Sequence, residues 1–426
     1  MNYRITNGQI LILNPENKFS VIDSDIFIRD NLICKVGSNA QLDNYETIDA
    51  KNQLIIPGLI NMHTHAYMSL LKNYADDVPF NEWLFERIMP IEDKLSYDEA
   101  YWSSLLACIE MIKTGTTCFM DMHMFKGQSC RAVQELGMRA FIGRGLVGED
   151  LYEDGYKRFS EALDEKKDFE SDLIKFVLSP HAIYSCSERL LRQVVEEANK
   201  LGLLKQIHLS ESTFEVDNSI SKYGKTPVEF LSDIGFLDGR TILAHCVKLS
   251  KNDINLIKKH NSNVVTNPAS NAKLGNGFAP VVDMLDNGIN VCLGTDSVAS
   301  NNTLNMFREM NLLSLLHKAA HDESTVLSAS EVLRISTTNA AKALGLEQKI
   351  GCILEGAYAD LVFVDLTAPS LFPNNNIISS LCYSANGAEV SSVMINGRFV
   401  MKNNELITID VERVHYEVKH IISKYL

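Results

Sequence analysis

The chain lacks the features that would direct it to a membrane, an oxidising compartment or nucleic acid. No apolar run approaches the length of a membrane span, and the N-terminal stretch is too polar for a signal peptide. The nine cysteines include no C-x-x-C pair, and most lie in apolar runs, where a reduced thiol packs as a small hydrophobic group. Basic residues are outnumbered, with 40 Lys and Arg against 54 Asp and Glu. We therefore expect a cytoplasmic protein whose partners include neither nucleic acid nor a membrane.

The composition is that of a soluble globular protein that can bury a large core. Hydrophobic residues make up 46% of the chain and charged residues 22%. At 426 residues the chain exceeds the size at which single cores usually divide, so we expect one large domain and a smaller one. The net charge of −14 leaves a small neutral or zwitterionic substrate open.

Both ends of the chain have the alternating sequence pattern of β-strands. Short alternating runs cover residues 9–13, 20–22, 25–28 and 32–36, and no helical pattern interrupts them. Similar runs return at 360–364, 393–395 and 398–401, where Asn396-Gly397 is a strong hairpin signal. Because the two ends resemble each other and differ from the middle, we expect them to meet in one small β-sandwich domain.

The middle of the chain alternates strands with helices. Capping boxes at Ser96-x-x-Glu99 and Ser185-x-x-Glu188 predict two helices, which end near Gly115 and Gly202. Apolar runs at 176–178, 206–209, 241–244, 263–266 and 289–294 predict strands. Repeated βα units over this length favour a (β/α)8 barrel. An open doubly wound sheet is the alternative, but it usually carries a G-x-G-x-x-G or P-loop, which the chain lacks.

These patterns divide the chain into three parts. We expect residues 1–56 to form the N-terminal part of the β-sandwich domain, 57–350 the (β/α)8 barrel, and 351–426 the C-terminal part of the sandwich with a terminal helix.

His63-Thr64-His65 directly follows the apolar run 54–60. Alternate side chains of a strand share a face, so the two imidazoles point the same way and can bind one metal ion. A single His-x-His is weak evidence, because ordinary histidines occur in the same pattern. The rest of the chain adds weight to it.

Five more polar residues lie at the ends of other predicted strands: His181, His208, Glu211, His245 and Asp296. Each has an ordinary explanation alone, as a hydrogen-bonded core histidine or a helix N-cap. In a barrel, however, the carboxyl ends of all the strands meet at one mouth, where catalytic residues lie. Their coincidence at several strand ends predicts one site.

Three imidazoles and a carboxylate suit one divalent ion that keeps an open position for water. Such binding lowers the pKa of water from about 15.7 toward roughly 7. Glu211, three residues past His208, can move the proton as general acid and base, and His245 can hold the water or polarise the electrophile. Zinc is the ion we expect first, while iron or manganese would suit the same donors.

With these motifs the chain resembles the amidohydrolase superfamily. The resemblance covers nearly the whole chain. Longer strings around Asp76, Glu92 and Ser300, with 267–275, are similar to those of 5-methylthioadenosine/S-adenosylhomocysteine deaminases. The resemblance implies His63, His65, His208 and Asp296 as metal ligands. It also implies proton transfer by Glu211 and orientation of water by His245 and Asp296.

The same resemblance implies substrate contacts. Glu92 matches a carboxylate that accepts the ribose hydroxyls, and Arg144 and His181 match further binding positions. Without the family, Glu92 reads as a surface charge and Arg144 as a salt-bridge partner. Trp83 could line the purine or pack under a loop.

One departure from the family pattern lies between residues 148 and 158. An ungapped count puts Tyr156 where relatives carry a second arginine, although Lys157 and Arg158 are adjacent. If Tyr156 does replace it, 5′-methylthioadenosine or adenosine should be preferred over S-adenosylhomocysteine.

The favoured function is hydrolytic deamination of the 6-amino group of an adenine nucleoside. The alternative within the superfamily is a deaminase or chlorohydrolase of guanine, 8-oxoguanine or a triazine, and Glu92 favours the nucleoside because a free base has no diol. A remote alternative is a non-catalytic scaffold. A cytidine-type zinc deaminase is excluded, because H-x-E followed by P-C-x-x-C is missing. The oligomeric state stays open, with a homo-oligomer compatible.

Overall fold

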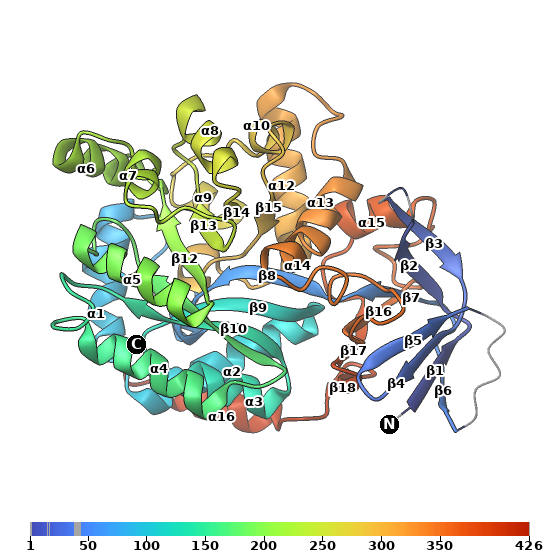
Figure 1. Cartoon of the computed structure of the whole chain (residues 1–426). Coiled ribbons are helices and arrows are strands. Elements are labelled where there is room, and N and C mark those ends of the chain that lie inside the picture. The colour runs from blue at the N-terminus through green and yellow to red at the C-terminus, as the bar shows by residue number, and fades with distance from the viewer. Residues whose placement is uncertain (1, 15, 17, 38–43, 426) are drawn as a thin grey trace.

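The computed structural model describes residues 2–14, 16, 18–37 and 44–425. Its centre is a sheet of parallel strands in the order β15-β14-β13-β12-β11-β10-β9-β8, so that strands adjacent in the sheet are also consecutive in the chain (Figure 1). The strands are β8 (Leu59–Thr64), β9 (Thr116–His123), β10 (Arg139–Leu146), β11 (Ile174–Pro180), β12 (Leu204–Leu209), β13 (Thr241–His245), β14 (Asn263–Thr266) and β15 (Val291–Leu293). The predicted barrel is confirmed.

Side chains join the first strand to the last and so bring the two edges of the sheet together. Asn61 of β8 donates through Nδ2 to Thr295 Oγ1 at 2.8 Å, and its Oδ1 accepts from the Thr295 backbone N–H at 3.0 Å. The Asp296 N–H donates to the His63 carbonyl at 2.9 Å. The residues that follow β15 are therefore held against the end of β8.

Helices surround the barrel and bury their apolar faces against it. The larger ones are α2 (Tyr97–Lys113), α3 (Gln128–Leu136), α4 (Tyr156–Phe169), α5 (Glu188–Leu201), α6 (Thr213–Tyr223), α7 (Pro227–Asp233), α8 (Lys251–Lys259), α10 (Val281–Asp286), α12 (Met306–His321), α13 (Ala329–Ile335) and α14 (Thr338–Ala343). Short helical segments over the mouth are η1 (Ala66–Leu71), η2 (Glu82–Ile88), α1 (Met89–Glu92), α9 (Pro268–Lys273) and α11 (Val298–Asn301).

The two predicted capping boxes have different outcomes. The box at Ser96 is confirmed, because its hydroxyl accepts from the Glu99 N–H and the Glu99 carboxylate accepts from the Ser96 N–H. The box at Ser185 is wrong, since α5 is capped by Ser187, whose Oγ accepts from the Leu190 N–H. The Ser185 hydroxyl instead lies 2.9 Å from His181 Nδ1, a contact between a loop and a strand end that local spacing does not reveal.

Both chain ends form the second, smaller domain, a β-sandwich. One sheet has the order β5-β4-β1-β6, and the other β19-β18-β17-β16-β7-β2-β3. Their strands are β1 (Asn2–Thr6), β2 (Gln9–Leu13), β3 (Phe19–Asp23), β4 (Ile26–Arg29), β5 (Leu32–Val36), β6 (Glu46–Asp49), β7 (Gln53–Pro57), β16 (Leu361–Asp365), β17 (Val390–Ile395), β18 (Arg398–Lys402) and β19 (Glu405–Leu406). Sheet residues from both ends share one apolar core, as predicted.

The apolar run 54–60 belongs to two sheets. Its first part is β7, which pairs with β16, and its second part is β8 of the barrel. The chain passes between them at Gly58, where a side chain would overlap Thr117, since an added Cβ would lie 1.8 Å from its Oγ1. We propose that residues 57–350 form the barrel domain and that 1–56 and 351–426 form the second domain.

Two further segments follow the sandwich strands. Helix α15 (Ile377–Tyr383) lies against α12 and α13, and the C-terminal helix α16 (Val411–Ile422) lies along α2 of the barrel (Figure 1). Just after α16, Lys424 and Tyr425 donate to the Glu99 carboxylate at 2.9 and 2.7 Å. The end of the described chain is therefore attached to the barrel.

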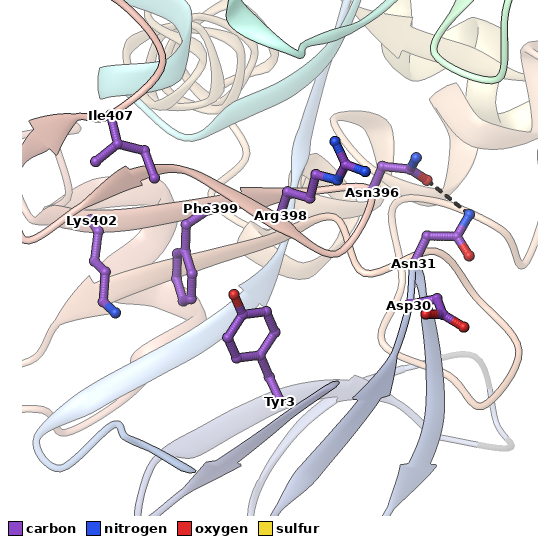
Figure 2. A pocket seen from close by; sticks show the side chains of 8 residues that line it. All are labelled: Tyr3, Asp30, Asn31, Asn396, Arg398, Phe399, Lys402 and Ile407. Atoms are coloured by element: carbon purple, nitrogen blue, oxygen red, sulfur yellow. Dashed lines mark hydrogen bonds between the residues drawn. The ribbon is translucent and has the colours of Figure 1, made fainter. Parts of the chain in front are cut away.

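A cavity of about 650 Å³ lies between the two sheets of the sandwich. Figure 2 shows Tyr3 directed toward Phe399, with ring centroids 5.7 Å apart and nearly perpendicular, and Asn31 bonded to Asn396. The Lys402 ammonium lies 5.2 Å from the centre of the Phe399 ring. The residues that line this cavity contact one another. The cavity therefore lies where the N-terminal and C-terminal parts of the sandwich domain meet.

The described chain holds no helix that is both long and apolar enough to cross a membrane. All nine cysteines are free, and eight of them are buried, as their apolar surroundings predict.

Candidate active site

The structure brings four of the predicted ligands together at the carboxyl ends of the barrel strands. His63 lies near the end of β8 with His65 just beyond it, His208 lies in β12, and Asp296 follows β15. Asp296 Oδ1 is 3.7 Å from His63 Nε2 and 3.5 Å from His65 Nε2. Ring nitrogens of the three histidines lie within 4.8 Å of one another. All four side chains are buried.

Backbone carbonyls determine which ring nitrogens face the centre of this cluster. His65 Nδ1 lies 2.8 Å from the Met122 carbonyl and His208 Nδ1 2.7 Å from the His181 carbonyl. A carbonyl only accepts, so both Nδ1 atoms carry the proton. The two Nε2 atoms lie 3.2 Å apart and face the centre of the cluster, where a shared cation could bind both.

His63 supplies a second sign that this donor set suits a cation. Both of its ring nitrogens are buried, and neither makes a hydrogen bond of good geometry with a residue that the structure describes. Buried polar atoms are rarely left unpaired, and an unpaired one calls for an ion, a water or a functional role. Imidazole nitrogens and one carboxylate are the ligands typical of catalytic divalent sites.

The electrostatics of the cluster favour the protonation states that a metal requires. Burial holds the pKa values of His63 and His208 well below the usual value, so both rings are neutral. Burial acts against ionisation of Asp296, but the imidazoles, His245 foremost, outweigh it and lower its pKa to about 2. Ser270 and Ser300 also donate to Asp296 Oδ2, at 2.6 and 2.9 Å.

Glu211 and His245 lie beside this cluster and face each other. The Glu211 Oε2 atom is 3.8 Å from His245 Nε2. Burial raises the pKa of Glu211, with His245 acting in the opposite direction. Burial lowers the pKa of His245, but the carboxylates of Glu211 and Asp296 outweigh it and raise it. Two buried groups whose pKa values move toward neutrality suit proton transfer.

The backbone is strained where these side chains turn into the mouth. Ser210, His245, Cys246 and Asp296 have φ angles of 50°, 71°, 50° and 64°, in the left-handed region that non-glycine residues rarely adopt. Such strain persists only where surrounding contacts maintain it, and it is concentrated at functional sites.

A cavity of about 330 Å³ opens over the cluster, and residues from several elements line it. Glu92 and His181 both lie on its wall, as does Trp83, whose indole N–H donates to the Ala299 carbonyl at 3.2 Å. Burial raises the pKa of Glu92 and lowers that of His181 to about 4. The three residues that the sequence predicts as substrate contacts therefore face one cavity.

The two arginines of the uncertain region have different surroundings. Arg144 is buried and donates through Nε and Nη2 to Glu161 Oε2 at 2.9 and 2.8 Å, and it is not among the residues that line the cavity. Arg158 lines the cavity, whereas Tyr156 is 56% exposed. Arg158 is thus the cation that a ligand in the cavity would meet from this segment.

Sequence reasoning missed residues that hold the candidate proton-transfer groups. Asn271 Oδ1 lies 2.9 Å from His245 Nδ1, and Asn276 Nδ2 donates to Glu211 Oε1 at 3.1 Å. Asn271 belongs to the string 267–275, which helped to indicate the family, but a string match assigned it no contact. The density of amide side chains between 267 and 276 was the available signal.

The family is decided by a match that spans most of the chain. The model of the amidohydrolase family matches residues 54–400. The chain belongs to this family. Its fold and its cluster of histidines with an aspartate agree with that membership.

Relatives within the family have specific names. A protein of Thermoanaerobacter pseudethanolicus named 5-methylthioadenosine/S-adenosylhomocysteine deaminase is 42% identical over 423 residues, which cover 98% of each chain. A 5′-deoxyadenosine deaminase of Methanocaldococcus jannaschii is 42% identical over 403 residues, covering 93% of this chain and 95% of the other. The crystal structure of an adenosine deaminase from Xanthomonas campestris with bound zinc is similar with a TM-score of 0.94 and 29% identity, covering 99% of this chain and 98% of the other.

Proposed function

We propose that this amidohydrolase hydrolyses the 6-amino group of an adenine nucleoside. Water adds at C6 of the purine, the bond from C6 to the amino nitrogen breaks, and ammonia and the inosine-type product leave. The observation that carries the proposal is the presence, around one cavity, of a buried histidine and aspartate cluster, a buried glutamate beside it and Glu92. The names of the relatives support the same reaction.

The residues proposed to hold one divalent ion are His63, His65, His208 and Asp296. Imidazoles with their Nε2 atoms turned inward and an ionised carboxylate fit a cation of the zinc, iron or manganese class. We propose zinc, which the Xanthomonas campestris structure contains. When bound, the ion supplies a Lewis acid that makes water nucleophilic near neutral pH.

Glu211 and His245 carry out the proton transfers in this proposal. Glu211 accepts a proton of the attacking water at Oε2 and delivers it to a ring nitrogen of the purine. It then takes the proton of the new C6 hydroxyl and delivers it to the departing amino group, so that ammonia leaves and the C6 carbonyl forms. Its raised pKa suits both directions of transfer. His245, 3.8 Å from that oxygen, orients the water together with Asp296.

The remaining proposed contacts bind the nucleoside. Glu92 accepts hydrogen bonds from the ribose hydroxyls, Trp83 lies against the purine, and His181 and Arg144 are retained from the family pattern. The paired Arg144 would act through its neighbours, because Glu161 already neutralises its charge. The proposed substrate is thus a small molecule.

An ammonia-release assay tests the function. Adenosine, 5′-methylthioadenosine, S-adenosylhomocysteine, adenine, guanine and cytosine would be compared on one preparation, with its metal content measured. We expect activity on the nucleosides and about one equivalent of metal. Deamination of guanine alone would favour the alternative hypothesis, that the protein deaminates free bases.

Glu92→Ala separates the two readings further. The variant should lose activity on nucleosides and keep any activity on free bases, because a ribose diol left unpaired costs about 1–3 kcal/mol. Equal losses on both classes would make Glu92 structural.

The position of Arg158 makes the 5′ substituent testable. Arg158→Ala should lower kcat/KM for S-adenosylhomocysteine, which carries a carboxylate, more than for 5′-methylthioadenosine. If the wild-type protein prefers 5′-methylthioadenosine and Arg158→Ala changes neither value, Arg158 does not bind the carboxylate.

A further inference from the structure

The short helix α9 and the turn after it hold three residues of the proposed site. Ser270 donates to Asp296, Asn271 contacts His245 and Asn276 donates to Glu211. The three holding side chains are buried and carry no charge. One continuous segment therefore touches both candidate proton-transfer groups. The inference drawn from this rests on the proposed function and extends it to the residues that aim those groups.

Asn276 distinguishes the two oxygens of Glu211. Oε1 accepts from Asn276 Nδ2 at 3.1 Å, while the Glu211 backbone N–H donates to Glu215 Oε2 at 2.9 Å. With its backbone and one oxygen held, Glu211 presents the other oxygen to His245. A rotated carboxylate would leave a buried amide donor without its acceptor.

Asn271 acts in the same way on His245. Its amide oxygen lies against Nδ1 and can only accept, so Nδ1 carries the proton and Nε2 is directed at Glu211. The Asn276 N–H donates to the Asn271 carbonyl at 2.9 Å, which links the two holding residues directly. The relative orientation of Glu211 and His245 is thus determined by one turn of backbone.

The segment is itself attached to its surroundings. The Ala269 N–H donates to Glu309 Oε2 at 3.0 Å, and Glu309 Oε1 accepts from Asn301 Nδ2 at 2.9 Å. Lys273 donates to Asp76 and Asn302. Because α9 is fixed at both ends, its amides can hold the site residues against rotation.

We propose that Asn276 and Asn271 are positioning residues: Asn276 fixes the orientation of the Glu211 carboxylate, and Asn271 fixes the tautomer and tilt of His245. Neither amide ionises, so both hold their partners in the same way across the working pH range. Neither residue needs to touch the substrate, and their effect passes through Glu211 and His245.

The test uses Asn276→Asp, Asn276→Ala and a control, Asn263→Ala. Aspartate keeps the shape of asparagine and removes the N–H donor. Asn263 has the same exposed fraction as Asn276, 5%, but its amide bonds carbonyls at the opposite end of the barrel strands. Measured quantities are kcat, KM, metal content and the melting temperature of the full-length protein.

Both Asn276 variants should lower kcat by about 10- to 100-fold, with KM and metal content close to wild type. Asn263→Ala should lower the melting temperature and leave kcat unchanged. Wild-type kcat in Asn276→Ala would overturn the proposal, because the donor would then be unnecessary. An equal fall of kcat in the Asn263 control would show a general loss of stability and overturn it too.

A crystal structure of Asn276→Ala tests the same idea without turnover. The Glu211 carboxylate should occupy more than one orientation or leave its position opposite His245, and an unchanged single orientation would overturn the proposal. If the wild-type protein releases no ammonia from any substrate, the proposed function fails, while this structural result still decides the role of Asn276.

Discussion

Two clusters of buried charge lie at opposite ends of the barrel, and they differ in how their atoms are paired. At the sandwich end, Arg139 donates to both oxygens of Asp360 at 2.8 and 3.2 Å and to the Asp172 carbonyl at 3.1 Å. Asp360 also accepts from the Asn396 N–H at 2.7 Å. At the mouth, neither ring nitrogen of His63 makes a hydrogen bond of good geometry within the described chain.

The difference separates a structural ion pair from a candidate active site. Burial alone does not distinguish them, because Arg139 and His63 are both almost inaccessible. What distinguishes them is unused bonding capacity, which the Arg139–Asp360 pair lacks and the mouth retains. Arg139 joins the barrel to the β-sandwich domain, whereas the mouth has ring nitrogens that can still bind a ligand.

The largest effect is expected from His208→Ala at the mouth. Removing one of the proposed ligands should deplete the metal and lower turnover at least about 10³-fold, while the folded barrel persists. Metal analysis, ammonia release and thermal unfolding check this. His317→Ala, which removes another buried histidine, should keep both metal and turnover. Full metal occupancy with normal turnover in His208→Ala would refute the ligand assignment.

Arg139→Ala should have the opposite profile. It leaves Asp360 buried without its partner, which costs about 3–5 kcal/mol of the free energy of unfolding. Metal content per folded molecule should not change. Urea unfolding measures the loss, and replacing both partners with apolar residues should restore much of it. A variant as stable as wild type would mean that the pair contributes nothing to the joint between domains.

Glu211→Gln tests whether the mouth contains groups besides ligands. The substitution keeps the shape and removes the ionisable group, so the metal should stay while kcat falls by at least about 10²-fold. Single-turnover kinetics with metal analysis would show this. Wild-type turnover would exclude Glu211 from proton transfer.

The smallest effect is expected from Glu99→Gln, at a carboxylate nearer the surface. Burial raises the pKa of Glu99, but hydrogen bonds from Ser96, Tyr425 and Lys424 outweigh it and lower the pKa to about 2. A lowered pKa in the folded state stabilises the protein above the unfolded value of 4.5, and this contribution is lost as the pH falls toward 2.

The variant should therefore be about 1–2 kcal/mol less stable than wild type at pH 7, and the difference should shrink below pH 4.5. Urea unfolding at several pH values measures it. A difference that does not depend on pH would show that the charge of Glu99 is not involved.

Much of the fold follows from patterns that are local in the sequence. The capping box at Ser96, the Asn396-Gly397 hairpin and the alternating runs near both ends correspond to elements of the structure. Parallel strands also gather their carboxyl ends at one mouth, so polar residues after several strands could be grouped before any distance was known.

The sequence by itself thus determined the elements, the barrel and the histidines, glutamate and aspartate that it brings together. Only the tertiary structure decided that Glu161 neutralises Arg144 while Arg158 lines the cavity, and that Asn276 holds Glu211. The physical reason is range. Periodicity and caps depend on neighbours a few residues apart, whereas these contacts join side chains whose proximity depends on the packing of whole elements.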